Sequence, residues 1–310
     1  MAETMATRQA YGKTLIELGE KYPQLVVMDA DLSKSTMTAE FGKTYPDRFF
    51  NMGIAEQNLY GAAAGLALSG KIVCASTFAM FATGRAFEII RNSIGYTRAN
   101  VKICATHAGI TVGEDGASHQ TFEDIALMRT IPGMTVINPS DGVSAKKLLE
   151  QAVAMEGPCY VRLGRAKVPV FYEDSDQLTL SRGNLVRDGK DVTIVATGIM
   201  VSEAMAAAEK LKEDGIDARI IDIHTIKPID EEILIKAAQE TGAIVTAEEH
   251  SIIGGLGSAV AEVIVKNCPV KMAMVGQKDT YGESGKPDEL KKKYGMTAED
   301  IEAAVKNLIG

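Results

Sequence analysis

Several things are missing from this chain of 310 residues, and each absence narrows what the protein can be. It has no run of about 18 apolar residues, the length that a membrane-spanning helix needs, and its first residues lack the charged and apolar regions of a signal peptide. The four cysteines are too far apart in sequence to form a metal-binding pair, so we expect small core residues in a reducing compartment. Together these absences predict a cytoplasmic protein without a cysteine metal site.

Positive charge is also scarce. The chain has 33 Lys and Arg against 41 Asp and Glu, a formal net charge of -8, and no basic cluster is visible. Because nucleic acids and anionic membranes are bound mainly through basic clusters, neither is an expected partner. Small molecules and other proteins remain as partners.

What the chain does contain is a long alternation of apolar strand-like segments and helical patterns. This alternation predicts mostly parallel sheets with helices on both faces, and a hydrophobic content of 46% allows two buried cores. The periodicity stops between about 168 and 191, which indicates a linker with one strand of its own. We predict an α/β protein of two doubly wound, mostly parallel-sheet domains, at residues 1–172 and 191–310, joined by a linker at 173–190. The expected strands lie at 25–29, 72–75, 101–105, 134–138, 159–162, 192–196, 218–223, 243–247 and 270–275.

One carboxylate, Glu56, begins a helix whose other residues are mostly apolar or very small. Such a helix can be buried on most of its faces. A carboxyl group placed there needs a hydrogen-bond partner and can be held ready for proton transfer near neutral pH. The alternative is that Glu56 only complements the positive end of its helix, an effect of roughly 0.3 to 1 kcal/mol.

Two phenylalanines, Phe78 and Phe81, lie where a strand ends and a helix expected at 79–94 begins. Their spacing puts both rings on one helical face, in a chain with only 5% aromatic residues. They are either ordinary core residues or a flat slot for a planar ring.

The segment from Thr106 to Gln120 collects histidine, carboxylate and glycine, and we expect a loop too polar to belong to a core. Its His107 and His119 can act as acid, base or hydroxyl ligand near neutral pH. A metal site of His107, Asp115 and His119 is a weaker alternative, because the spacing matches no helical zinc pattern. A solvated surface loop is the third interpretation.

Taken together, the segments Met52–Asn58, Ser76–Phe81 and Thr106–Gln120 resemble, in this order, the pyrimidine-binding domain of transketolase, a thiamine-diphosphate enzyme. The second half of the chain is similar to the C-terminal domain of the same family. The resemblance thus covers nearly the whole chain. It implies transfer of a two-carbon ketol unit from a ketose phosphate to an aldose phosphate, as in the pentose phosphate pathway.

The resemblance also implies roles for individual residues. Glu56 would hydrogen-bond the aminopyrimidine of the cofactor. Residues in contact with the cofactor would be Phe78, Phe81, Asp31 and Leu32. Residues in contact with the sugar phosphate would be Arg8, Ser35, His107, Asp115, His119 and Arg165. Arginine suits a phosphate because its fork bonds two oxygens at once, and Arg162 is an alternative to Arg165 for this task.

The family's site for diphosphate and Mg²⁺ needs Gly-Asp-Gly, and this tripeptide occurs nowhere in the chain. The segment Gly113-Glu114-Asp115-Gly116 has an extra residue. The resemblance therefore implies the C-terminal half of a split transketolase, inactive alone. An N-terminal partner subunit would hold Mg²⁺ and the diphosphate, in a heterotetramer with two copies of each half, in which this half forms a homodimer.

Other functions stay open. Deoxyxylulose phosphate synthase usually has Asp-Arg where Thr106 and His107 stand, and the β subunit of a 2-oxo acid dehydrogenase lacks a loop like GEDGASHQ. A scaffold subunit that has lost the cofactor is the non-catalytic alternative. A glycine cluster at 254–259 resembles a dinucleotide fingerprint, but Val260 stands at its third glycine, so we expect a close turn between strand and helix. His224 is expected in a turn, and His250 is expected to pair with Glu248 and Glu249.

Overall fold

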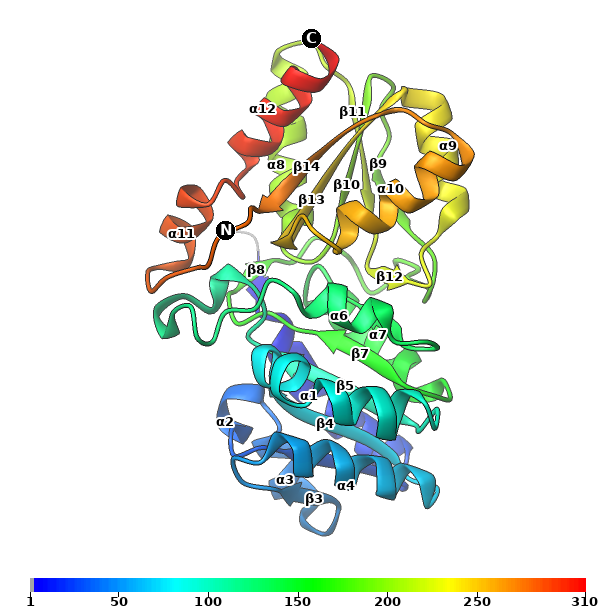
Figure 1. The fold of residues 1–310 in the computed structure, drawn as a ribbon, viewed down its shortest axis with the longest axis vertical. Coiled ribbons are helices and arrows are strands. Elements are labelled where there is room, and N and C mark those ends of the chain that lie inside the picture. The colour runs from blue at the N-terminus through cyan, green and yellow to red at the C-terminus, as the bar shows by residue number, and fades with distance from the viewer. Residues whose placement is uncertain (1–2) are drawn as a thin grey trace.

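The computed structural model describes residues 3–310, which form two bodies stacked along the long axis of Figure 1. The lower body is built on a seven-stranded sheet and the upper body on a five-stranded sheet. A short antiparallel ribbon of β1 (Thr4–Met5) and β8 (Val168–Pro169) lies between them. The predicted α/β architecture of two mostly parallel sheets is confirmed; the division at residues 172 and 191 stays a prediction.

The first sheet has parallel neighbours everywhere except at one edge, where β12 runs antiparallel to β6. Across the sheet the strands are β12 (Thr225–Lys227), β6 (Thr135–Ile137), β7 (Cys159–Arg162), β5 (Val101–Thr106), β4 (Ile72–Phe78), β2 (Leu25–Asp29) and β3 (Phe49–Asn51). Strands β2, β4, β5 and β7 are buried along their whole length, as expected for a sheet covered on both faces.

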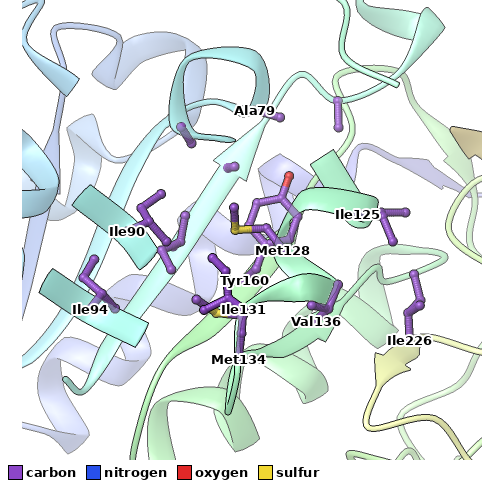
Figure 2. Packing of buried hydrophobic residues seen from close by; sticks show 14 of the residues in the cluster. Ala79, Ile90, Ile94, Ile125, Met128, Ile131, Met134, Val136, Tyr160 and Ile226 are labelled. Atoms are coloured by element: carbon purple, nitrogen blue, oxygen red, sulfur yellow. The ribbon is translucent and has the colours of Figure 1, made fainter. Parts of the chain in front are cut away.

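Helices cover the two faces of this sheet and enclose separate cores. They are α1 (Thr7–Lys21), α2 (Ser33–Thr36), α3 (Ala39–Thr44), α4 (Glu56–Leu68), α5 (Phe87–Ile89), α6 (Asp124–Thr130) and α7 (Gly142–Ala154). The core on the face of α4 and α6 is drawn in Figure 2, where the ring of Tyr160 lies among Met128, Ile131 and Met134.

The prediction of one regular helix at 79–94 is wrong, although the segment is helical. The segment consists of two π-helical turns, Phe81–Arg85 and Ile90–Gly95, on either side of the short α5. A stripe of buried apolar residues recurs every four positions, at Ala82, Ala86, Ile90 and Ile94. In an α-helix such a stripe would rotate by about 40° per step, and the wider turns keep it facing the core.

The second sheet runs in the order β14 (Lys271–Gln277), β13 (Ala243–Ser251), β10 (Val192–Ala196), β11 (Ala218–Asp222) and β9 (Asn184–Arg187). Only β9 is antiparallel to its neighbour, and it is the strand expected within the linker. The helices of this half are α8 (Met200–Glu213), α9 (Glu231–Thr241), α10 (Leu256–Asn267), α11 (Pro287–Lys293) and α12 (Ala298–Ile309).

The turn expected after His224 is wrong, because residues 225–227 form strand β12 of the first sheet. From the sequence, residues 225–227 before Pro228 indicate a turn. They form a strand because the edge of β6, which is distant in sequence, supplies their hydrogen-bond partners. Ile226 of β12 lies near Val136 and Ile125 in Figure 2. The second half of the chain therefore completes the first sheet and shares its core.

Two composition-based expectations can be compared with the described residues. Cys74, Cys104 and Cys159 are buried and unpaired, as expected of small core residues, whereas Cys268 is half-buried. Among residues 3–310, none of the helices has both the length and the apolar character to cross a membrane.

Candidate active site

The residues singled out in the sequence meet at the carboxyl edge of the first sheet. Phe78 is the last residue of β4, His107 follows β5, and Asp31 lies two residues beyond β2. In parallel sheets this edge is where ligands bind, because the chain leaves the sheet there and loops can diverge. The sheet thus brings together residues that are 29 to 76 positions apart in the sequence.

Glu56 is the first residue of α4, and only 2% of it is exposed. The positive end of the helix stabilises its carboxylate, and Arg85 Nη1 lies 3.1 Å from its Oε2. The expectation that α4 is buried on most faces is wrong for the single chain. One face is exposed, including Gly61, Gly65 and Leu68, because no other element within residues 3–310 covers it.

The two phenylalanine rings are nearly parallel, with centroids 6.0 Å apart and an interplanar angle of 12°. A third ring between them would need about 7 Å, so nothing flat fits there. Phe78 is buried, and the imidazole of His107 stacks on it with a centroid distance of 3.8 Å. Phe81 is only half-buried, and so it is the ring that a planar ligand can reach.

Arg85 joins Glu56 to Phe81, and the sequence analysis missed it. Its guanidinium carbon lies 5.3 Å from the centroid of Phe81 while Nη1 contacts Glu56. The available signal was its spacing, since a residue four positions after Phe81 lies on the same helical face. The two groups predicted to hold the cofactor ring are thus both in contact with one cation.

His107 has a left-handed backbone, with φ of 58°, and is almost fully buried. Burial and the nearby charges of Arg8 and Arg165 lower the pKa of His107 to about 3, so the ring is neutral at pH 7. Its Nδ1 shares a hydrogen bond of 2.8 Å with Thr106 Oγ1. His119, half-buried, lies edge-on to Phe81 at a centroid distance of 5.3 Å.

Two arginines adjoin this histidine. Arg8 is half-buried and donates from Nη1 to the carbonyl oxygen of Ser35 at 2.6 Å, while its Nε has no partner among the described residues. Burial and the charge of Arg165 lower the pKa of Arg8. Arg165 donates to Glu114 Oε2 at 2.7 Å. Two nearby guanidinium groups with incompletely satisfied donors are suited to an anion.

Arg162, the alternative to Arg165, lies elsewhere. Only 3% of it is exposed, and its Nε donates to Asp124 Oδ2 at 2.7 Å. Its Nη2 donates to the backbone oxygen of Glu249 in the second half of the chain at 2.8 Å. Burial is outweighed by the Arg162 and His250 charges, which hold the pKa of Asp124 below its usual range. Arg162, the last residue of β7, therefore binds the two halves together and is enclosed between them.

The loop after β2 is organised by Asp29. Its carboxylate accepts hydrogen bonds from Leu32 N at 2.6 Å and from the hydroxyls of Thr36 and Thr38 at 2.6 and 2.9 Å. These bonds present Asp31, which is exposed with φ of 64°, and the half-buried Leu32 and Ser35. Asn51, which the sequence analysis did not single out, donates to Asp31 Oδ1 at 3.1 Å and accepts from Gly53 N at 3.0 Å.

The interpretation of Thr106–Gln120 as a solvated surface loop is wrong. Most of this segment is buried between the two halves of the chain. Residues 110–115 form a 3₁₀ turn whose Thr111 N donates to Glu249 Oε1 at 2.7 Å. Gly109 has φ of 80°, and a Cβ there would lie 2.3 Å from the carboxyl carbon of Glu249, so no other residue fits. Only the tip, which includes Asp115, is exposed.

A metal site at His107, Asp115 and His119 finds no support in this geometry. His107 stacks on Phe78, and Asp115 points from the exposed tip of the loop. Within residues 3–310, no cluster of three or more His, Cys, Asp or Glu side chains is arranged to hold a metal ion.

The glycine cluster at 254–259 serves the fold. The N-terminus of α10, where a dinucleotide phosphate would bind, already holds the carboxylate of Glu248, which accepts from Leu256 N at 2.6 Å and Gly257 N at 2.8 Å. A Cβ on Gly255 would lie 2.0 Å from Glu248 Oε2. His250 is buried 3.6 Å from Glu248, as expected, but its Nδ1 is hydrogen-bonded to the backbone oxygen of Ser251 at 2.7 Å, and the described residues show no ion pair of His250 with Glu249.

Comparison with known proteins follows the same division of the chain. Residues 3–170 match the family "Transketolase, pyrimidine binding domain", and residues 181–301 match "Transketolase, C-terminal domain". A Methanocaldococcus jannaschii protein described as a transketolase C-terminal section is 56% identical over 95% of this chain and 93% of its own length. A 6-deoxy-6-sulfo-D-fructose transketolase subunit from Clostridium sp. is 44% identical over 95% of this chain and 91% of its own length.

A solved structure described as a split gene transketolase, inactive beta4 tetramer, is also similar to this chain. It shares 54% sequence identity with a TM-score of 0.91, and the match covers 99% of both chains. The similarity therefore extends over the whole described fold, including both halves and the site between the sheet edge and the loop after β5.

Proposed function

This chain belongs to the transketolase family, and we propose that it is the C-terminal subunit of a split transketolase that uses thiamine diphosphate. One observation carries the proposal. From Glu56, through Phe81, Phe78 and His107, to Arg8 and Arg165, successive side chains contact or influence one another along a single sheet edge. We call these six residues and Arg85 the site arc. It begins with a buried carboxylate beside an accessible ring and ends with paired guanidinium groups.

The first end of the site arc suits the aminopyrimidine of the cofactor. Glu56 would hydrogen-bond a ring nitrogen, and Phe81 would stack on the ring, with Phe78 as its support. The fit is supported by Arg85, because a flat nitrogen-rich group already lies against both Glu56 and Phe81. Asp31 and Leu32 would lie beside the cofactor. When bound, thiamine diphosphate would supply the nucleophilic carbon that takes up the two-carbon unit.

The other end suits the sugar phosphate. Arg8 and Arg165 would bind the phosphate oxygens, together with Ser35, because their donors are only partly satisfied within the chain. His107 is neutral at pH 7 and would contribute a hydrogen bond rather than a charge. Asp115 and His119 would contact hydroxyl groups of the sugar. Enclosure of Arg162 in an ion pair favours Arg165 as the phosphate ligand.

An N-terminal partner subunit would complete the site. This chain lacks the Gly-Asp-Gly motif, so Mg²⁺ and the diphosphate would be held by the partner. Apolar side chains at both ends of α4 are exposed, with 78% of Ile54 accessible just before the helix and 63% of Leu68 at its last residue, which is the surface an obligate interface would cover. We infer a heterotetramer with two copies of each subunit. The tetramer named for the similar split-gene protein supports assembly of this half with itself.

We propose xylulose 5-phosphate as donor and ribose 5-phosphate as acceptor, as in the pentose phosphate pathway. A second donor class has a specific observation in its favour, since the Clostridium relative is named for a sulfo-fructose. A sulfonate, like a phosphate, presents three oxygens to Arg8 and Arg165. Both donors therefore belong in the test.

The test is turnover with thiamine diphosphate and Mg²⁺, for this chain alone and mixed with a candidate N-terminal subunit. We expect ketol transfer only in the mixture. Decarboxylation of pyruvate without ketol transfer between the sugars would favour the sister enzymes. A verified complex that is inactive in every assay would favour a scaffold subunit.

A further inference from the structure

We propose that Arg85 is a placeholder for the cofactor, a side chain that fills the aminopyrimidine position of this subunit and must leave before thiamine diphosphate can bind. The inference rests on the proposed function, since it assumes that Glu56 and Phe81 hold that ring. It goes beyond the proposed function because it assigns a gating role to Arg85, which lies outside the three segments that carry the resemblance in the sequence.

The geometry places one guanidinium on both of the groups that the cofactor would use. Nη1 of Arg85 is 3.1 Å from Oε2 of Glu56, and the guanidinium carbon is 5.3 Å from the ring centroid of Phe81. Like an aminopyrimidine, a guanidinium is planar, donates N–H groups to a carboxylate and stacks on an aromatic face. Arg85 therefore imitates the two contacts of the ligand.

The two cannot be bound together. Glu56 is only 2% exposed, and its Oε2 already has Arg85 Nη1 as a partner at 3.1 Å. The other face of Phe81 is turned to Phe78, and 6.0 Å between these rings leaves no second stacking position. A ring that stacks on Phe81 and bonds Glu56 must take the place of the guanidinium.

Arg85 is also able to leave. Its side chain is 54% exposed, and the described residues give it no side-chain hydrogen bond besides the one to Glu56. It lies at the end of a π-helical turn next to the exposed Gly84, which has no side chain to block the path into solvent. Glu56, in contrast, is fixed at the start of α4.

A placeholder lowers the apparent affinity for the cofactor, because the binding-competent form is only a fraction of the population. Until the cofactor arrives, Arg85 neutralises the carboxylate and covers the ring in the cofactor-free subunit. Because the side chain of Arg85 is 54% exposed and screened by solvent, its ion pair and its cation–π contact are each weak, so removing Arg85 should tighten binding by about threefold to thirtyfold.

The experiment measures thiamine diphosphate binding to the assembled, cofactor-free complex by calorimetric titration, with Mg²⁺ present. We compare wild type with Arg85→Ala, Arg85→Lys and Arg91→Ala. Arg91 is an exposed arginine of the same segment that bonds Asn92, so it controls for the loss of one charge. Circular dichroism and melting temperature confirm that each variant is folded.

Tighter binding by Arg85→Ala, an intermediate value for Arg85→Lys and no change for Arg91→Ala would support the placeholder. Equal or weaker binding by Arg85→Ala, with wild type binding normally, would overturn it and leave the proposed function intact. If neither protein binds thiamine diphosphate, the proposed function fails and the placeholder fails with it.

Discussion

Arg162 and Arg165 are three residues apart in sequence and have opposite surroundings. Arg162 is enclosed by Asp124 from the first half of the chain and by Glu249 from the second. Arg165 is one third exposed; it donates to the backbone oxygen of Val112, and its ion-pair partner among the described residues is Glu114, whose side chain is 59% exposed. The first arginine belongs to a closed cluster between the halves, and the second to the open end of the site arc.

In this fold, therefore, some charged residues stabilise the contact between the halves, and others remain available to bind a ligand. A buried ion pair is costly to break, because the remaining partner is left without compensation. An exposed pair contributes little and can exchange its partner for a ligand. The closed cluster of Asp124, Arg162, Glu249 and His250 should therefore respond to substitution with lost stability, and the site arc with lost activity.

The largest expected effect lies in the site arc. Glu56→Gln keeps the size of the side chain and removes its ability to exchange a proton, so turnover of the assembled enzyme should fall by about a hundredfold to ten-thousandfold. Steady-state kinetics with xylulose 5-phosphate and ribose 5-phosphate measure it. Unchanged turnover would remove Glu56 from catalysis and favour a scaffold.

Next is Arg162→Ala in the closed cluster. It leaves Asp124 and Glu249 buried without a cation, so the free energy of unfolding should fall by about 3 to 5 kcal/mol in urea titrations. Arg165→Ala is the matched control and should change it by less than about 1 kcal/mol. If both variants lose equal stability, the division into closed and open charges is wrong.

Arg165→Ala, the control for stability, should instead weaken binding of a phosphorylated sugar. Arg8→Ala and Arg165→Ala each remove a charged donor from the phosphate, so the KM of a phosphorylated donor should rise about tenfold to a hundredfold with kcat little changed. Unphosphorylated xylulose serves as the comparison substrate, for which the variants and wild type should have similar KM values. Arg91→Ala controls for net charge. A rise in KM that is equal for both sugars would speak against phosphate binding.

The smallest effect is a pH dependence at the contact between the halves. Asp222 is fully buried, accepts from Ser140 and Tyr172, and burial raises its pKa to about 7. The folded state thus binds this proton more tightly than the unfolded state, whose value is 3.8, so the stability contribution decreases as pH rises from about 4 through 7.

Asp222→Asn removes this titration. The variant should be more stable than wild type at pH 8 by about 1 to 3 kcal/mol and close to wild type at pH 4. Urea unfolding across this range measures the difference, with the exposed Asp47→Asn as control. A stability difference that does not vary with pH would contradict the assigned titration.

Local patterns were sufficient for much of the fold. The bounds of β2, β7 and β10 agree with the predicted strands, because each is a short and mostly apolar segment. Segments whose conformation depends on distant partners were harder. Strand β12 exists only because β6 is beside it, and the wide turns at Phe81–Arg85 and Ile90–Gly95 follow the core they face.

For the site, residue types and their order singled out the side chains without showing how they meet. Arg85 was missed, although its spacing from Phe81 could have indicated it. Asn51 was missed because its partners, Asp31 and Gly53, lie on another loop and two residues away. The choice between Arg162 and Arg165 could not be made from two basic residues in one segment.

By itself, the sequence determined the alternation of strands and helices, the family, and the residue types available for chemistry, since these depend on composition and short-range spacing. Tertiary structure decided which of two arginines is enclosed, that the loop after β5 is buried between the halves, and that Arg85 lies over Glu56 and Phe81. Burial and charge pairing depend on segments that are distant in the chain and adjacent only in the fold, and so no local pattern could have supplied them.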